Sequence, residues 1–322
     1  MKAAVYYETG PPSVFRYEEV PDPVCDPDGI LVDVKAVSIE GGDVLNRARG
    51  ELASRPHIVG YQCSGIVREV GGNVKDRVVG QRVVAIMPHG SHASMVALPV
   101  SSTWLVPEGL DLESAACVPI PFSTADHCLF EFGHLKAGET VLIQAGAGGV
   151  GLAAIQLAKR AGATVLATAS SDEKLERLRD FGLDHGINYR TTDFVAAARE
   201  LTSGRGVDLA VDCVGGRTLQ GSIECLAYRG RAISMGHAGR DDQPPDVSAL
   251  ASGNRTLTGV SLEWEALLQP DRVRAMVARH LDDVASGALN VVIDRKYPLS
   301  EAASAHAYIE SRQAFGRVLL VP

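Results

Sequence analysis

The sequence lacks the features that mark several classes of protein. Aromatic residues make up only 5% of its 322 residues, too few to build a surface on which nucleic-acid bases stack. Lys and Arg number 31 against 39 Asp and Glu, and the formal charge of −8 argues against a polyanionic partner. No run of about 18 apolar residues occurs, so we expect no transmembrane helix. These absences predict a protein with neither a nucleic-acid nor a membrane partner.

Closely spaced cysteines are absent as well. The six cysteines are scattered, and no two form a C-x-x-C pair, which excludes a zinc knuckle and a thioredoxin-like redox motif. Such scatter is typical of reduced, buried thiols in the cytosol. Residues 1–7 carry one positive charge, Lys2, and no apolar core of signal-peptide length. We therefore expect a cytoplasmic protein.

What the chain does contain is a change of pattern near residue 118. Before that point, short apolar runs are separated by Gly and Pro, which predicts a β-rich region that forms a small barrel or sandwich. The runs are Ile30–Val37, Ser64–Val70 and Arg82–Met87. After it, apolar strands alternate with helical segments, which predicts a parallel sheet covered on both faces.

The alternating segments can be bounded along the chain. Predicted strands cover residues 140–145, 164–169, 185–189, 207–214, 231–236 and 257–262. Predicted helices cover residues 151–162, 172–181, 194–201 and 218–226. The last part returns to a helix over 272–284 and short strands over 291–293 and 318–321, which we expect to fold back onto the first domain. The predicted class is α/β, with one domain of residues 1–117 and 264–322 and a doubly wound domain of residues 118–263.

A glycine-rich loop follows the first strand of the alternating region. It contains G-x-G-x-x-G at Gly146, Gly148 and Gly151. Such a loop turns the chain sharply, lets a pyrophosphate approach bare backbone, and presents the N-terminal amides of the next helix to phosphate. The pattern predicts a dinucleotide site at Gly146, Ala147, Gly148, Gly149, Val150 and Gly151.

The residues after the second strand indicate which dinucleotide binds. An NAD site would place an acid there to accept a hydrogen bond from the ribose 2′-hydroxyl, but the chain has Ala169-Ser170-Ser171. Ser170, Lys174 and Tyr189 offer hydroxyls and a positive charge to a 2′-phosphate, which favours NADPH. Two alternatives stay open. Ser170 would begin a capping box with Glu173, or a shifted register would bring Asp172 to the ribose.

Segments along nearly the whole chain resemble the zinc-independent quinone oxidoreductase branch of the medium-chain dehydrogenase/reductase superfamily. They are Met1-Lys2-Ala3, Val59-Gly60, Gly65-Ile66-Val67, Val79-Gly80-Gln81-Arg82-Val83, Pro121-Phe122-Ser123-Thr124-Ala125, Lys136–Ile143, Val211-Asp212-Cys213-Val214-Gly215 and Gly316-Arg317-Val318-Leu319-Leu320. The resemblance implies a GroES-like catalytic domain, a Rossmann domain, a nicotinamide held between them, and a homodimer joined through the nucleotide domain.

The resemblance also implies roles for single residues. Thr124, Gly236, Val260, Ser261 and Leu262 correspond to positions beside the nicotinamide. Arg312 resembles a family arginine near the 2′-phosphate. For Thr124, the alternative is a helix N-cap.

Zinc-dependent relatives bind a catalytic metal through a Cys, a His-Glu pair and a further Cys or His. The resemblance places Glu40, Tyr61-Gln62 and Ile120 at these positions, and those side chains cannot build a tetrahedral N/S site. We therefore predict no metal. Without a Lewis acid to assist alcohol oxidation, hydride should pass to an acceptor that is already polarised, such as a quinone or an α,β-unsaturated carbonyl.

The predicted substrate cleft is lined by Glu40, Gln62 and His92, with Tyr61 as an orienting or proton-donating group. Alternatively, Tyr61 is a core aromatic with its hydroxyl bonded to backbone, Glu40 pairs with Arg47, and His92 is a packing or solvent-facing histidine.

The chain departs from ordinary quinone reductases around this cleft, at Glu40, at Tyr61-Gln62 and near His92 and His127. Two other functions therefore stay open. One is an enoyl-thioester reductase of a biosynthetic pathway, and the other is a non-catalytic NADPH-binding protein.

Overall fold

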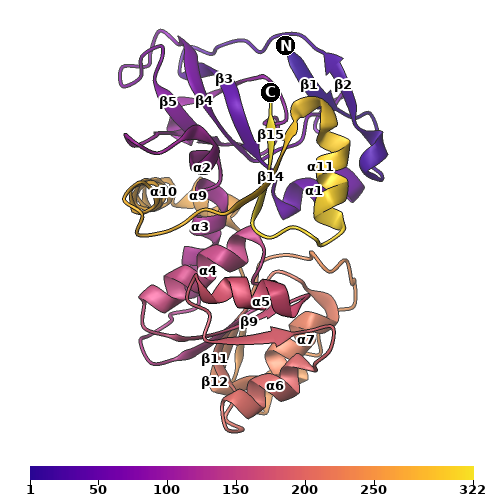
Figure 1. Cartoon of the computed structure of the whole chain (residues 1–322). Helices are drawn as coiled ribbons and strands as arrows, with labels where there is room; N and C mark the ends of the chain where they lie inside the picture. Colours follow the sequence, from indigo (N-terminus) through magenta and orange to yellow (C-terminus); the bar gives the residue numbers. More distant parts are fainter. The chain divides into compact units, whose positions relative to one another are not determined.

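The chain leaves its first structural unit once and returns to it. In the computed structural model, which describes residues 1–322, one unit comprises residues 1–120 and 269–322 and the other residues 121–268. In Figure 1 the first unit carries the indigo, purple and yellow ends of the colour scale, and the second runs from magenta to orange.

The first unit is built on a mixed sheet whose strands come from both of its segments. The sheet order is β14-β15-β3-β4-β5-β7, with β6 paired to β3, and β1 and β2 form a separate antiparallel pair. The strands are β1 (Lys2–Val5), β2 (Arg16–Glu19), β3 (Gly29–Ser38), β4 (Gln62–Val70), β5 (Arg82–Ile86), β6 (Met95–Pro99), β7 (Thr103–Leu105), β14 (Ile293–Pro298) and β15 (Arg317–Val321). The three strands expected between residues 30 and 87 are confirmed as β3, β4 and β5.

The first unit also contains helices from both of its segments. They are α1 (Gly41–Arg49), α2 (Leu112–Ala116), α10 (Pro270–Ala285) and α11 (Ala302–Glu310), and α3 (Pro119–Asp126) begins at the boundary with the second unit. The core packs apolar side chains of the N-terminal strands, such as Val32 and Val67, against Leu299 and Val318 from the C-terminal segment. Side chains of the C-terminal segment therefore belong to the core of the first unit.

The second unit is a parallel sheet with the order β10-β9-β8-β11-β12-β13. Its strands are β8 (Thr140–Ile143), β9 (Thr164–Ala169), β10 (His185–Asn188), β11 (Val207–Asp212), β12 (Leu226–Ser234) and β13 (Thr256–Gly259). Its helices are α4 (Gly149–Arg160), α5 (Asp172–Arg179), α6 (Phe194–Leu201), α7 (Gly216–Glu224), α8 (Ser248–Ala251) and α9 (Leu262–Leu268), and a π-helical turn covers His127–Glu131. The predicted doubly wound sheet is confirmed.

The direction of the strand order reverses between β8 and β11. From this point the chain runs outward through β9 and β10 on one side and through β12 and β13 on the other. In open parallel sheets, ligands bind outside the carboxyl ends of the strands at such a switch point. The topology therefore predicts that a ligand binds at the loops that follow Ile143 and Asp212.

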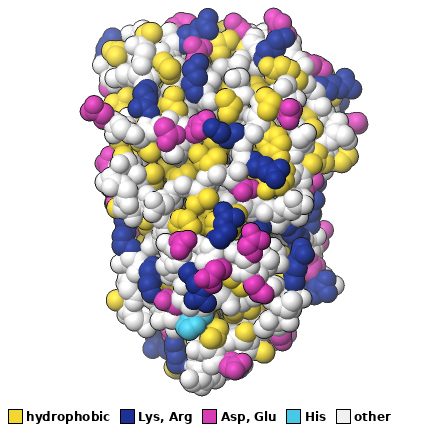
Figure 2. Space-filling model, in the orientation of Figure 1, with side chains coloured by type: hydrophobic (Ala, Val, Ile, Leu, Met, Phe, Trp, Pro, Cys, Tyr) yellow, Lys and Arg dark blue, Asp and Glu magenta, His cyan; other side chains and the backbone are white.

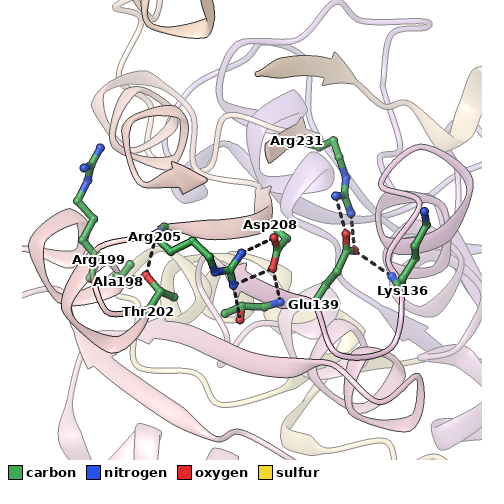
Figure 3. Close-up of polar contacts among 10 residues, drawn as sticks. Lys136, Glu139, Ala198, Arg199, Thr202, Arg205, Asp208 and Arg231 are labelled. Atoms are coloured by element: carbon green, nitrogen blue, oxygen red, sulfur yellow. Dashed lines mark hydrogen bonds and ion pairs between the residues drawn. The ribbon is translucent and has the colours of Figure 1, made fainter. Parts of the chain in front are cut away.

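Two bidentate ion pairs lie at the opposite, amino edge of the same sheet (Figure 3). Arg231 donates to both carboxylate oxygens of Glu139 at 2.7 and 2.9 Å, and Arg205 donates to both oxygens of Asp208 at 2.5 and 3.0 Å. Asp208 also accepts a hydrogen bond from the backbone N–H of Thr140 at 2.8 Å, which ties β11 to β8. These groups satisfy one another, so the amino edge has a structural role.

The surface is polar and mixed in charge on the face drawn in Figure 2, where Lys and Arg alternate with Asp and Glu among apolar side chains. None of the helices combines the length and apolar composition needed to cross a membrane.

Candidate functional site

Two glycines of the glycine-rich loop are required by close packing. A Cβ atom on Gly146 would lie 2.9 Å from the Cβ of Ala167, and one on Gly151 would lie 2.5 Å from the carbonyl oxygen of Ala145. Ala145 itself has a left-handed backbone, with φ of 53°. The chain is therefore folded back tightly between β8 and α4, as the motif predicts.

Gly148 differs from these two because the fold does not require a glycine there. It is the N-cap of α4, with an extended backbone (φ −82°, ψ 171°), and a Cβ atom would meet only the Ala145 oxygen at an ordinary 3.4 Å. The residue is exposed, and no side chain caps the helix and no acid lies in its first turn. Bare backbone and uncapped N–H groups at a helix N-terminus are what a pyrophosphate needs, so the loop fits the predicted group.

The candidates for 2′-phosphate binding follow the next two strands. Ser170 comes directly after β9, and Tyr189 comes directly after β10 with its side chain 38% exposed. Lys174 is the third residue of α5. The helix is capped by Ser171, whose Oγ accepts from the backbone N–H of Lys174 at 3.3 Å. The alternative in which Ser170 begins a capping box is therefore wrong, because the N-cap of α5 is the next residue, Ser171.

Asp172 is tied to the neighbouring strand. Its Oδ1 accepts a hydrogen bond from the Asn188 amide at 3.0 Å. One of the two carboxylate oxygens of Asp172 is thereby bonded to β10.

The candidates for nicotinamide binding lie mostly beyond β12 and β13. Gly236 follows β12, and Val260, Ser261 and Leu262 connect β13 to α9. The backbone N–H of Val260 donates to the Ser234 oxygen at 2.8 Å, which extends the pairing of these strands past the end of β13. The predicted strand 257–262 therefore ends early, because Leu262 already begins α9.

Thr124 and Arg312 belong to other parts of the chain. Thr124 is half-buried inside α3, which begins at Pro119, so the N-cap alternative for Thr124 is wrong. Arg312 belongs to the first unit, where it is exposed in a left-handed turn (φ 58°) after α11.

The positions that resemble zinc-ligand positions form a buried polar cluster in the first unit. Glu40 caps α1, is 5% exposed and makes an ion pair with Arg317. The amide of Gln62 donates to the same Glu40 oxygen, and its Oε1 accepts from the backbone N–H of Ile120 at 3.0 Å. The cation facing Glu40 is thus a guanidinium.

Arg317 was not recognised from the sequence as a site residue. Besides Glu40, it donates to Ser38 Oγ and to the Ile39 oxygen, both at 2.7 Å. Burial raises the pKa of Glu40 above its ordinary value, against the opposing effect of Arg317. The suggested pairing of Glu40 with Arg47 is wrong, because Arg47 pairs with Glu310. No group of three or more His, Cys, Asp or Glu side chains in the chain is arranged to hold a metal ion.

Tyr61 is half-buried beside α1. Its hydroxyl oxygen accepts a hydrogen bond from the Asn46 amide at 2.7 Å, and a Cβ atom on Gly42 would lie only 3.0 Å from that hydroxyl. The hydroxyl is therefore bonded to a side chain, which corrects the alternative of a backbone-bonded core tyrosine. The missing side chain of Gly42 leaves space for the Tyr61 ring, and the Asn46 amide holds the Tyr61 hydroxyl oxygen in place.

His92 is completely buried and contacts a second buried histidine. Its Nε2 lies 3.1 Å from Nε2 of His306 in α11, and its ring stacks on Phe15 with 6.2 Å between centroids. His127 is also buried, with Nδ1 2.8 Å from the Ser123 oxygen. His92 is therefore a packed core histidine, and the alternative of a solvent-facing histidine is wrong.

The two imidazoles should make the protein sensitive to acid. Burial lowers the pKa of His92 to about 3, and burial, His92 and Arg47 lower the pKa of His306 well below its ordinary value. In the unfolded chain both pKa values return to about 6.5. The unfolded state therefore binds more protons below about pH 6.5, and the free energy of unfolding falls as the pH falls through this range.

We expect the free energy of unfolding to drop by about 2–3 kcal/mol between about pH 8 and pH 5.5 from this pair. Urea unfolding at both pH values measures it. The variant His306→Gln removes one of the titrating groups, so its drop should be about half as large. An undiminished drop in the variant would mean that other groups cause the acid sensitivity.

Comparison with known proteins agrees with this architecture. Residues 26–108 match the family of the alcohol dehydrogenase GroES-like domain, and residues 149–279 match the zinc-binding dehydrogenase family. In an alignment 329 residues long, the chain is 34% identical to 2-haloacrylate reductase of a Burkholderia species. The alignment covers 99% of this chain and 98% of that protein.

Two further relatives extend the comparison. The structure of Escherichia coli quinone oxidoreductase complexed with NADPH superposes with a TM-score of 0.93 at 29% identity, covering 100% of both chains. Highly-reducing polyketide synthase 1 of Aureobasidium melanogenum is 33% identical over 96% of this chain, which spans 14% of that enzyme. The identity and coverage of these relatives, together with the glycine loop and the two-unit fold, assign the chain to the quinone oxidoreductase branch of the medium-chain dehydrogenase/reductase superfamily.

Proposed function

We propose that this protein is an NADPH-dependent oxidoreductase that reduces a quinone or an α,β-unsaturated carbonyl compound without zinc. The observation that carries the proposal is the uncapped start of α4, where Gly148 leaves backbone open although the fold would accept a larger residue. When bound, NADPH supplies a hydride from its nicotinamide ring. The family relatives support a quinone, a haloacrylate or another activated alkene as the acceptor.

Different residues at the carboxyl edge of the second sheet bind different parts of the cofactor. The amides of Gly149, Val150 and Gly151 bind the pyrophosphate together with the backbone of Gly146, Ala147 and Gly148. Ser170, Lys174 and Tyr189 bind the 2′-phosphate, since Ala169-Ser170-Ser171 stands where an NAD site would place an acid, and Arg312 is a further candidate. Gly236, Val260, Ser261 and Leu262 position the carboxamide, and Thr124 stands beside the ring.

Zinc independence is supported by the cluster around Glu40. A guanidinium, an amide and a backbone N–H already engage Glu40 and Gln62, so these side chains are not arranged as metal ligands. Tyr61, held by Asn46, is the group proposed to orient the acceptor or to return a proton to it.

A second function has support from one observation. Similarity to the polyketide synthase over nearly the whole chain favours an enoyl thioester as the acceptor. Such a substrate has the same polarised C=C–C=O unit, so the same arrangement would serve.

The protein is also proposed to be a cytoplasmic homodimer. All six cysteines are free, which suits a reducing compartment. β13 is the outer strand of the second sheet, and α9, which follows it in the chain, exposes Trp264, Leu267 and Leu268 by 62 to 67%. An open strand edge and exposed apolar side chains each favour pairing with a second copy. Sedimentation equilibrium tests the dimer, and a monomer at micromolar concentration would contradict it.

A substrate panel tests the function. We expect purified protein to oxidise NADPH with quinones, 2-haloacrylates or simple enones, and to do so equally well after dialysis against a strong metal chelator. Activity confined to enoyl thioesters would move the assignment to the second function. Tight NADPH binding without turnover of any acceptor would indicate a non-catalytic NADPH-binding protein, and loss of activity with loss of stoichiometric zinc would overturn zinc independence.

A further inference from the structure

A buried chain of polar side chains runs beneath the glycine-rich loop. It comprises Thr168 at the end of β9, Gln144 after β8, Ser222 in α7 and Asp212 at the end of β11, and each is at most 2% exposed. Buried polar groups are costly unless they are paired, so four of them in contact need a reason beyond packing. The cluster could not be predicted from the sequence, because its members are far apart along the chain.

The hydrogen bonds of the cluster all run in one direction. The Thr168 hydroxyl donates to Gln144 Oε1 at 2.7 Å, and Gln144 Nε2 donates to Ser222 Oγ at 3.1 Å. The Ser222 hydroxyl in turn donates to Asp212 Oδ2 at 2.8 Å. Because every donor points toward the carboxylate of Asp212, the cluster has one consistent set of proton positions, and its last hydrogen bond is charge-assisted.

At one end, the cluster holds the first residues of the glycine-rich loop. Thr168 Oγ1 accepts from the backbone N–H of Ala145 at 3.1 Å, and its carbonyl oxygen accepts from the N–H of Gly146 at 2.8 Å. Ala145 has a left-handed backbone that non-glycine residues rarely adopt. Thr168 therefore secures the strained residue that aims the loop at the start of α4.

At the other end, the cluster holds the loop after β11. Asp212 Oδ1 accepts from the N–H groups of Val214 and Gly215, both at 2.8 Å. β8 and β11 are the adjacent strands at which the sheet order reverses. The cluster thus connects the two loops that flank the switch point, where ligands of such sheets bind.

We infer that Thr168, Gln144, Ser222 and Asp212 are positioning residues that hold the two loops at the spacing NADPH requires. This inference rests on the proposed function, because it takes the glycine-rich loop to be the pyrophosphate site. None of the four side chains needs to touch the cofactor. They act through Ala145 and Gly146 on one side and Val214 and Gly215 on the other.

The variant Thr168→Val tests the inference with little change in volume. It leaves the Ala145 N–H and Gln144 Oε1 without their partner, and we expect the Kd of NADPH to rise about tenfold. Adenosine 2′-phosphate lacks the pyrophosphate, so its Kd should change by less than about twofold. Thr168→Ser keeps the hydroxyl and should restore NADPH affinity. Thr140→Val makes the same change at the amino edge of the sheet and should leave both Kd values unchanged.

Ser222→Ala provides a second variant should Thr168→Val fail to fold. It breaks the row of hydrogen bonds between Gln144 and Asp212 without changing either loop. It should raise the Kd of NADPH about threefold and again leave the Kd of adenosine 2′-phosphate nearly unchanged.

Two results would overturn the inference. One is unchanged NADPH affinity in folded Thr168→Val, and the other is an equal loss of NADPH and adenosine 2′-phosphate affinity, which a general loosening of the unit would cause. Failure of the proposed site itself is distinguishable, because NADPH would then also bind normally to Gly148→Val.

Discussion

Replacing Gly148 with Val is expected to raise the Kd of NADPH by at least about a hundredfold while the protein stays folded. The backbone of Gly148 is extended and suits valine, and its Cβ position has only one neighbour, at 3.4 Å. The branched side chain would stand over the uncapped amides of α4, where a phosphate must approach. Isothermal titration with NADPH measures the loss, and thermal unfolding checks the fold.

Lys174→Ala is the matched comparison for this variant. NADH carries the pyrophosphate but no 2′-phosphate, so Gly148→Val should weaken NADPH and NADH binding alike, whereas Lys174→Ala should weaken only NADPH binding. Normal NADPH affinity in Gly148→Val would remove the pyrophosphate from the loop. Equal losses for both nucleotides in Lys174→Ala would remove Lys174 from the 2′-phosphate site.

The second large effect is expected in the first unit, on stability. Arg317→Met should lower the free energy of unfolding by about 3–5 kcal/mol, because it leaves the Glu40 carboxylate buried without its cation. The guanidinium also bonds Ser38 and the Ile39 oxygen, and these acceptors lose their donor as well. Denaturant unfolding at neutral pH measures the loss.

A double variant separates charge burial from lost packing. Glu40→Gln removes the stranded charge, so Glu40→Gln/Arg317→Met should recover most of the stability lost in the single variant. The deficit of Arg317→Met relative to the natural chain should also shrink as the pH falls toward the ordinary pKa of a glutamate, since protonation neutralises Glu40. A loss below about 1 kcal/mol, or no recovery in the double variant, would contradict a buried ion pair of this strength.

Features that depend on neighbouring residues could be predicted from the sequence. The strand β9 and the helix α6 have the predicted bounds, and the glycine motif lies where it joins β8 to α4. Apolar periodicity and the steric need for glycine are local properties, so they can be recognised in one sequence. The same locality explains the one-residue error in the N-cap of α5, whose first residue was predicted correctly, since Ser170 and Ser171 offer the same hydroxyl.

Features that depend on the fold could not be predicted in this way. Glu40 and Arg317 are separated by 277 residues, and His92 and His306 by 214. Nothing near Glu40 distinguishes Arg317 from Arg47 as its partner, and only the pairing of β15 with β3 decides between them. The helix α1 was missed because it begins with Gly41-Gly42 and lacks a long apolar stripe, and its stability comes from packing and from the cap at Glu40.

The place of β15 between β14 and β3 has a consequence for biosynthesis. The ribosome translates β3 long before β15, the strand that lies beside it and that supplies the guanidinium for Glu40. The second unit, whose residues are continuous in sequence, is translated before β15. Until β15 has been translated, the nascent first unit therefore has an unpaired edge at the end of β3, and a stop codon before Arg317 would leave Glu40 without its cation.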